Sequence, residues 1–339
     1  MQGKPKLIII LGPTASGKSE LAVFLAREIK KQKLGGFTGA EIISADSRQV
    51  YKYLDVGTNK VPGRWKHINH SSRQDKLHLS AIAKRCSLNA ITFIYKNIPH
   101  HCIDFVHPKR IYTVAEFKQC AEKAIAEIQK RGNIPMLVGG TGLYIRAVAD
   151  GMVLPEVPSN KKLRTELKKK STIELFNILQ KLDPERAINI DAKNPRRLIR
   201  AIEICKATGK QVPALCSQPD FETLFIGIKK SDLELKRALQ KRSKKQIPGL
   251  LKEIRLLLKM KVSKKRIREL GFEYKLALET KNSGSLASGI RIKQLAEELM
   301  KENWHYAKRQ MTWFKPDTHI KWISNKIKAL IYIKKFLNQ

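Results

Sequence analysis

The sequence predicts an α/β protein with a doubly wound parallel sheet and an inserted all-helical module. Short aliphatic runs alternate with helical patterns over residues 6–138, and this alternation is typical of parallel sheets. A glycine-rich loop follows the first aliphatic run, as at the ligand-binding edge of such sheets. After Pro155 the strand patterns stop, and residues 156 to about 217 contain helical patterns only.

Each element follows from its own hydrophobic pattern. Residues 6–11 form a continuous aliphatic run, as expected of a strand that is buried on both faces. Residues 19–30 place apolar side chains at helical spacing. The other predicted elements are strands at 41–45, 134–138 and 221–228, a helix at 115–131, and helices of the module at 163–169, 173–182 and 195–208.

These patterns divide the chain into two parts. Residues 1–152 and 218–339 are expected to form the core, with basic helices towards the C-terminus, and residues 153–217 the helical module. Residues 63–97 are polar and lie between two recognisable blocks. We interpret them as a local insertion, and the sequence assigns them no role.

Composition excludes several classes of protein. The chain has 339 residues, of which 42% are hydrophobic, so it is not a disordered polycation. Its longest apolar run, Leu7–Leu11, is far shorter than the roughly 20 residues of a membrane-spanning helix. Five cysteines without a C-x-x-C pair favour neither a disulfide framework nor a zinc ribbon. A soluble, reduced, cytoplasmic protein without a membrane partner is expected.

The charge points to a polyanionic partner. Lys and Arg number 67 against 30 Asp and Glu, which gives a formal net charge of +37. The densest stretch, 229–268, holds 16 basic and 3 acidic residues, and apolar residues recur on one helical face within it. Such a density favours contact with nucleic acid over a merely solvated surface.

Residues 12–19 match the phosphate-loop pattern G-x-x-x-x-G-K-[ST] and predict a P-loop NTPase-like core. The loop lies between a predicted strand and a predicted helix, as the pattern requires. Glycines allow backbone N–H groups to surround an anion, Lys18 supplies a positive charge, and Ser19 can ligate Mg²⁺. The predicted phosphate-binding residues are Gly12, Pro13, Thr14, Ala15, Ser16, Gly17, Lys18 and Ser19. The pattern does not identify the phosphate compound.

Asp46 follows the second predicted strand. The carboxyl ends of strands in a doubly wound sheet face the ligand crevice, so Asp46 is expected on the same side as the phosphate loop. A carboxylate there can act as a general base, support a metal ion, or cap the next helix. Position alone leaves all three roles open.

Several blocks, taken in order, resemble the tRNA dimethylallyltransferase family, also called tRNA isopentenyltransferases or IPP transferases. The blocks span residues 7–314, and one departure is Phe272, where the family commonly has Tyr. Besides the phosphate loop they are SADSRQVY (44–51), GTNK (57–60), PHHCID (99–104), VGGTGLY (138–144), NPRRLIRAIE (194–203), LGFEY (270–274) and KRQMTWF (308–314).

The resemblance implies a reaction and its catalytic residues. The family transfers a dimethylallyl group from dimethylallyl diphosphate to N6 of the adenosine on the 3′ side of the anticodon. By resemblance Asp46 is the base, while Lys18 and Mg²⁺ held by Ser19 stabilise the departing diphosphate. Arg242 best matches the family's diphosphate-binding arginine, with Arg237 as the alternative, although both could simply belong to the basic face. A monomer is expected.

The resemblance also implies contacts with the tRNA anticodon stem-loop. Residues 46–49 are expected to touch the target nucleotide, and Thr141 either lines the channel or forms a plain turn. His100 and His101 are expected to contact RNA or to make structural hydrogen bonds rather than to bind zinc. The predicted tRNA-binding residues are Asp46, Ser47, Arg48, Gln49, Thr141, Arg196, Arg197, Leu198, Ile199 and Arg200.

Three other functions remain open at this point. A P-loop kinase of nucleosides or nucleotides would explain the phosphate loop and Asp46, but not the charge of +37. An enzyme that prenylates free adenine nucleotides would share the core, but not need the long basic C-terminal half. A non-catalytic RNA-binding protein could use the loop as a nucleotide switch.

Overall fold

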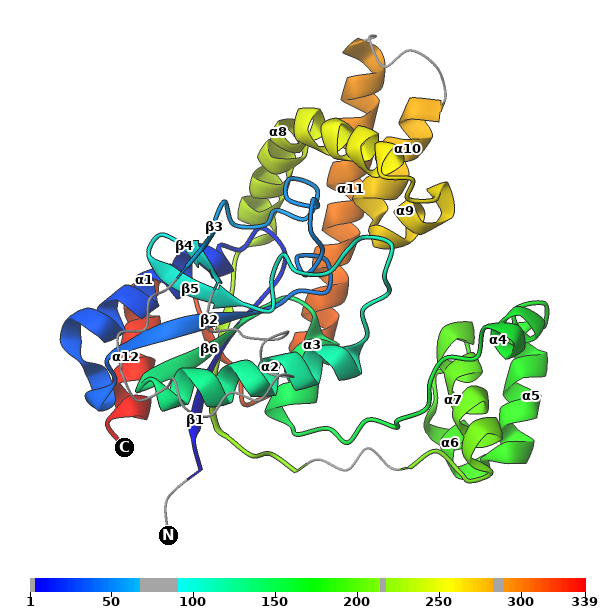
Figure 1. Cartoon of the computed structure of the whole chain (residues 1–339), viewed down its shortest axis with the longest axis horizontal. Helices are drawn as coiled ribbons and strands as arrows, with labels where there is room; N and C mark the ends of the chain where they lie inside the picture. Colours follow the sequence, from blue (N-terminus) through cyan, green and yellow to red (C-terminus); the bar gives the residue numbers. More distant parts are fainter. Residues whose placement is uncertain (1–3, 68–90, 214–217, 283–288) are drawn as a thin grey trace. The chain divides into compact units, whose positions relative to one another are not determined.

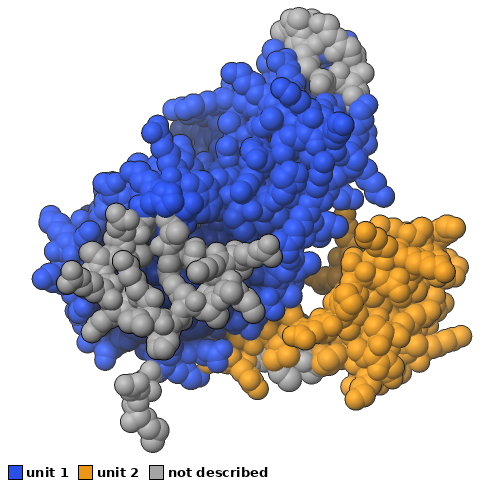
Figure 2. All heavy atoms as spheres, in the orientation of Figure 1, with its two compact units in different colours: residues 1–149, 220–339 blue, residues 150–219 orange. Residues whose placement is uncertain are grey.

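The computed structural model of the chain has two compact units. Unit 1 contains residues 1–149 and 220–339, and unit 2 contains residues 150–219 (Figure 2). The structure describes residues 4–67, 91–213, 218–282 and 289–339. Most of the expected 63–97 insertion lies outside the described residues, and only its two ends, 63–67 and 91–97, can be placed.

Unit 1 is built on a sheet that contains eight strands in the described part of the chain. Their spatial order is β3-β4-β5-β2-β6-β1-β7-β8. Pairing is parallel except where β4 meets β3 and β5, which confirms the doubly wound parallel sheet and adds an antiparallel edge that the sequence did not predict. The strands are β1 Lys6–Leu11, β2 Gly39–Ala45, β3 Arg64–Lys66, β4 Thr92–Tyr95, β5 Ile98–His101, β6 Asn133–Gly139, β7 Glu222–Ile228 and β8 Lys321–Ile323.

Helices cover both faces of this sheet, which explains why β1 is aliphatic throughout. Alternate side chains of a strand point to opposite faces. Ile8 and Ile10 pack under α1 (Lys18–Gln32) and α12 (Lys326–Leu337), whereas Leu7, Ile9 and Leu11 pack with α2 (Val114–Lys130) and α3 (Gly142–Ala149) (Figure 1). Leu7 to Leu11 are therefore each buried against one layer of helices or the other.

A second group of helices packs beyond the carboxyl edge of the sheet. It consists of α8 (Asp232–Lys259), α9 (Lys264–Leu270), α10 (Phe272–Asn282) and α11 (Gly289–Phe314) (Figure 1). Leu250, Ile254 and Tyr274 of these helices share a core with Val50 and Leu54, which follow β2. This core joins the basic helices to the loops at the end of the sheet.

Unit 2 is all-helical, as the sequence predicts. Its helices are α4 (Lys161–Leu167), α5 (Thr172–Leu182), α6 (Pro184–Asn189) and α7 (Pro195–Thr208). Leu179 and Leu198 are fully buried in a core of its own. The unit begins and ends within three residues of the expected 153–217 module.

Two expectations from composition concern membranes and cysteines. In the described ranges, no helix combines the length and the apolar character needed to cross a bilayer. The cysteines that the structure describes, Cys102, Cys120 and Cys205, are free thiols.

The two histidines at the end of β5 make structural hydrogen bonds, which is one of the two roles that the sequence left open for them. Both are buried: His100 Nδ1 lies 2.9 Å from the carbonyl oxygen of Ile98, and His101 Nε2 lies 2.7 Å from Glu41 Oε2. Glu41 also accepts hydrogen bonds from Arg131 and Asn133. Burial alone would raise the pKa of Glu41, but the bonds from His101 and Arg131 outweigh burial and lower the pKa to about 2.

We predict that Glu41→Gln lowers the free energy of unfolding by roughly 2–3 kcal/mol at neutral pH, because buried donors lose an anionic acceptor. The pKa of Glu41 is depressed in the folded state, so its contribution is present above the ordinary pKa of 4.5 and is lost as the pH falls towards about 2. Urea denaturation across this range measures both effects. The matched control, Glu122→Gln, removes a partly exposed helix pair and should change stability by less than about 0.5 kcal/mol. A pH-independent difference would contradict the assignment to Glu41.

Candidate functional site

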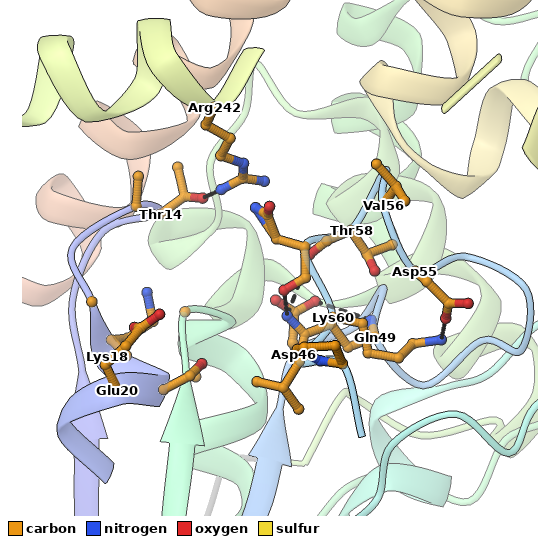
Figure 3. Close-up of a pocket in the computed structure, with 18 of the residues that line it drawn as sticks. Thr14, Lys18, Glu20, Asp46, Gln49, Asp55, Val56, Thr58, Lys60 and Arg242 are labelled. Carbon is orange, nitrogen blue, oxygen red and sulfur yellow. Dashed lines mark hydrogen bonds and ion pairs between the residues drawn. The ribbon is translucent and has the colours of Figure 1, made fainter. Parts of the chain in front are cut away.

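The carboxyl ends of β1, β2 and β6 open into one cavity of 1050 Å³ within unit 1. Loops after these strands line it together with residues of α8 and α11. Arg242 of α8 points towards the phosphate loop (Figure 3). Its charged and polar lining includes Thr14, Lys18, Ser19, Asp46, Gln49, Asn59, Lys60, Lys241, Arg242, Lys245, Tyr306 and Gln310.

The phosphate loop has the conformation its sequence predicts. Gly12 and Gly17 adopt positive φ angles of 144° and 92°, and a Cβ on Gly12 would lie 3.1 Å from the carbonyl oxygen of Ile228. No side chain caps α1 at Gly17, so amides of its first turn remain available to an anion. Of the predicted residues, Thr14, Ala15, Gly17, Lys18 and Ser19 line the cavity, whereas Gly12, Pro13 and Ser16 are buried behind it.

Lys18 lies half-buried in the cavity, where its Nζ donates to the carbonyl oxygen of Pro13 at 2.7 Å. Burial lowers the pKa of Lys18 to about 8; the positive charge of Arg242 acts in the same direction, and Asp46 and Glu20 oppose it. A bound anion would reverse this loss of proton affinity, because it stabilises the ammonium form.

The structure separates the two candidate arginines. Arg242 reaches from α8 into the cavity, where a guanidinium Nη donates to Thr14 Oγ1 (Figure 3). The side-chain oxygen of Asn59, assigned from the hydrogen-bond network, lies 2.8 Å from the other Nη. Arg237 is exposed and does not line the cavity. Arg242 therefore faces the phosphate loop, and Arg237 does not.

Asp46 both caps a turn and presents a free oxygen. Its Oδ1 accepts hydrogen bonds from the backbone N–H groups of Arg48, at 2.8 Å, and Gln49, at 3.3 Å. Its Oδ2 makes no hydrogen bond with any residue that the structure describes, and the side chain lines the cavity. The capping role and the base role that the sequence left open are therefore compatible.

The other residues expected around the target nucleotide do not all reach the cavity. Gln49 lines it, but Ser47, Arg48 and Thr141 do not. Thr141 Oγ1 accepts from the backbone N–H of Ser47 at 3.1 Å and so joins the loops after β2 and β6. Arg48 donates to the carbonyl oxygen of Glu269 at 2.8 Å. Of the two roles that the sequence left open for Thr141, this contact fits the turn.

Sequence reasoning missed three residues on the cavity wall. Gln310 Oε1 accepts from the backbone N–H of Thr14 at 2.7 Å, and its Nε2 donates to the carbonyl oxygen of Gly140 at 2.9 Å. Gln310 and Asn59 lie in the KRQMTWF and GTNK blocks, so the blocks marked them without indicating a role. Tyr306 had no signal in the sequence.

The predicted RNA-binding residues of α7 divide into two kinds. Arg196 and Arg197 are exposed, and Arg200 is partly exposed but paired with buried Glu203 at 2.6 Å. Leu198 and Ile199 are buried in the core of unit 2, so the expectation that they bind tRNA is wrong. They lie on the opposite side of the helix, where their apolar side chains stabilise the unit.

Fold and cavity together define a doubly wound α/β protein with a phosphate loop at the carboxyl edge of its sheet. More particularly, the chain belongs to the IPP transferase family, whose model matches residues 92–317.

Similar proteins cover nearly the whole chain. A tRNA dimethylallyltransferase of Carboxydothermus hydrogenoformans is 33% identical over 94% of this chain and 92% of its own length. One from Finegoldia magna is 32% identical over 95% of this chain and 92% of its own length. The crystal structure of a full-length tRNA isopentenylpyrophosphate transferase from Bacillus halodurans is 28% identical, with a TM-score of 0.62 over 98% of this chain and 96% of that one.

We predict that inorganic diphosphate binds more weakly as the pH rises above about 8, because Lys18 then loses its charge in the free protein. The dissociation constant should rise by up to about tenfold per pH unit there. Isothermal titration calorimetry at constant ionic strength measures it. Lys18→Arg, which stays charged, controls for titration of the diphosphate itself. Parallel pH profiles of the two proteins would rule out Lys18 as the titrating group.

Proposed function

We propose that the protein transfers a dimethylallyl group from dimethylallyl diphosphate to N6 of the adenosine 3′-adjacent to the anticodon in tRNA, releasing diphosphate. Membership of the IPP transferase family and the names of its relatives support an enzyme of this kind. One observation carries the proposal: a single cavity joins the cationic phosphate loop to the free carboxylate oxygen of Asp46.

The residues suit the chemistry of this transfer. The N6 lone pair forms a bond to C1 of the dimethylallyl group while the C1–O bond to diphosphate breaks. An adenine amine is a weak nucleophile, so removal of an N6 proton by Asp46 Oδ2 assists the attack. Lys18, Arg242 and the loop amides are placed to stabilise the negative charge that develops on the leaving diphosphate.

The cavity also fits a magnesium ion bound together with the diphosphate. Mg²⁺ prefers oxygen ligands and usually binds through few protein groups plus substrate phosphates. Ser19 and Asp46 both line the cavity and offer such oxygens, and we propose Ser19 as the protein ligand. When bound, the ion would neutralise charge on the leaving group.

The proposed RNA substrate is the anticodon stem-loop. The target base must leave its stack to enter the cavity, and the net charge of +37 favours binding to the phosphate backbone. Exposed Arg196 and Arg197 of unit 2 are the proposed contacts. We further propose that the enzyme acts as a monomer in the cytoplasm.

The decisive experiment incubates the purified protein with dimethylallyl diphosphate, Mg²⁺ and unmodified tRNA. Mass spectrometry of the digested nucleosides should show a dimethylallyl group on adenosine. Parallel reactions offer free adenine nucleotide as acceptor, or ATP with a nucleoside. Prenylation of the free nucleotide alone, or phosphorylation of the nucleoside, would refute the proposed function and support the corresponding alternative activity.

We predict that Asp46→Asn lowers the single-turnover rate by about a hundredfold or more, because the amide cannot accept the N6 proton. The Asn side-chain oxygen can still accept from Arg48 and Gln49, so the turn should persist. Rapid-quench assays measure the rate, and filter binding measures tRNA affinity, which should not change. Asp46→Ala, which loses cap and base together, provides the comparison. Near wild-type turnover in Asp46→Asn would show that Asp46 caps the turn and does not act as the base.

We predict that tRNA affinity falls steeply with salt and that an Arg196→Ala/Arg197→Ala variant reduces the logarithmic salt slope by about two. Each arginine removed leaves one phosphate without a cationic partner. Fluorescence anisotropy with labelled tRNA at several salt concentrations measures the slope. The matched control is Lys30→Ala/Lys31→Ala, which removes two exposed cations at the end of α1 furthest from the phosphate loop. Equal slopes for the two double variants would remove α7 from the RNA-binding surface.

A further inference from the structure

The basic stretch 229–268 contains three acidic residues, and one of them is buried within unit 1. Asp232 and Glu234 lie exposed in the first turn of α8, where Glu234 completes a capping box with Ser231. Glu253 lies in the same helix and is only 8% exposed. A buried carboxylate requires hydrogen-bond donors, so its partners indicate what it holds in place.

All described hydrogen-bond partners of Glu253 come from two places, and most lie in the loop of residues 55–60. Its Oε1 accepts from the backbone N–H groups of Asp55, at 2.8 Å, and Val56, at 2.6 Å. Its Oε2 accepts from the N–H of Gly57 at 3.0 Å and from the hydroxyl of Tyr274 at 2.8 Å. Consecutive amides around one carboxylate form an anchor that specifies the path of the backbone.

The 55–60 loop is also clamped by packing. A Cβ on Gly57 would lie 2.4 Å from the Tyr274 hydroxyl, and one on Gly249 would lie 2.7 Å from Val56, so the contacts leave no space for a displaced loop. At the far end of the loop, buried Lys60 donates to Asp104 at 2.7 Å and to the carbonyl oxygen of Tyr51 at 2.7 Å. The segment between these two anchors faces the cavity, and Asp55, Val56 and Lys60 at the anchors line it too.

That segment contacts the residues of the site directly. Asn59 faces the guanidinium of Arg242, and the carbonyl oxygens of Thr58 and Asn59 accept from Gln49 Nε2 at 3.3 Å each. Val56 and Thr58 line the cavity (Figure 3), and so does Asn59. The position of the loop therefore determines whether Asn59 can orient Arg242.

One face of α8 joins all these contacts. Arg242, Gln246 and Glu253 are separated by four and seven residues, and about 3.6 residues per turn place them on one stripe. Arg242 projects into the cavity, Gln246 Nε2 donates to the carbonyl oxygen of Gly57 at 2.8 Å, and Glu253 accepts the three amides. α8 therefore fixes the position of Arg242 relative to the 55–60 loop, which contacts Arg242.

We propose that Glu253 is a positioning residue for diphosphate binding: it anchors the 55–60 loop so that Asn59 holds Arg242 towards the phosphate loop. The inference rests on the proposed function, because it assumes that Arg242 binds diphosphate. Burial raises the pKa of the Tyr274 hydroxyl, which therefore stays protonated and serves as a donor to Glu253.

The test compares Glu253→Gln with Glu41→Gln, which removes a buried carboxylate of the same unit whose partners, His101, Arg131 and Asn133, lie outside the loop. In Glu253→Gln an amide NH₂ must face either the N–H of Gly57 or those of Asp55 and Val56, so the anchor is broken. The dissociation constant for inorganic diphosphate and the KM for dimethylallyl diphosphate should each rise about tenfold. Glu41→Gln should lower the thermal midpoint and leave both constants unchanged.

A double-mutant cycle with Asn59→Ala tests whether Glu253 affects diphosphate binding through Asn59 and Arg242. Asn59→Ala alone should weaken diphosphate binding to a similar extent, and adding Glu253→Gln should weaken it little further, since both changes remove the same orientation of Arg242. Should Glu253→Gln fail to fold, Tyr274→Phe removes one donor to Glu253 and should raise the same constants by a smaller factor.

Two results would overturn the inference. One is an unchanged diphosphate affinity in Glu253→Gln, and the other is a full additional loss in the double variant. Absence of tRNA prenylation by the wild-type protein, with diphosphate binding that still responds to Glu253→Gln, would refute the proposed function and leave the inference about Glu253 intact.

Discussion

An anion site must bring cations together before the anion is present, and this constraint governs the structure around the cavity. Lys18 and Arg242 repel each other, and burial removes the water that would screen them. The protein compensates with neutral acceptors, the carbonyl oxygen of Pro13 and the hydroxyl of Thr14, and with the carboxylate of Asp46 nearby. These groups balance the two cations only in part, so an anion bound beside Lys18 and Arg242 would relieve their repulsion as well as add contacts.

The same constraint explains why the site draws on distant parts of the chain. A short phosphate loop offers amides and one lysine, and further charge has to come from another element. α8 supplies Arg242, and α11 supplies Gln310, which bonds Thr14 and Gly140 and thereby joins the loops after β1 and β6. Because both helices pack on the core beyond the carboxyl edge, stability of that core and geometry of the site are linked.

Sequence patterns predict those features that are determined locally. The strands β1 and β6, the phosphate loop and Asp46 lie as predicted. Strand burial and glycine conformation depend on neighbouring residues in the sequence, so a local pattern is enough to predict them. The short strands β3, β4, β5 and β8 were not predicted, because three or four residues carry too little periodicity. The partners of Arg242 depend on tertiary packing, and no spacing in the chain indicates that Asn59 meets it.

A motif shared with a family does not identify which of its residues contact the substrate. In NPRRLIRAIE, Leu198 is fully buried and Glu203 almost so, and the carboxylate of Glu203 pairs with Arg164 and Arg200. Such residues are needed to build unit 2, whereas Arg196 and Arg197 have their side chains exposed on its surface. A similar division applies to the basic helix α8, where Arg242 serves the cavity, Glu253 holds a loop, and exposed cations such as Lys244 face solvent. Net charge alone therefore overstates the number of residues available to RNA, and burial has to be known before a cation is assigned to it.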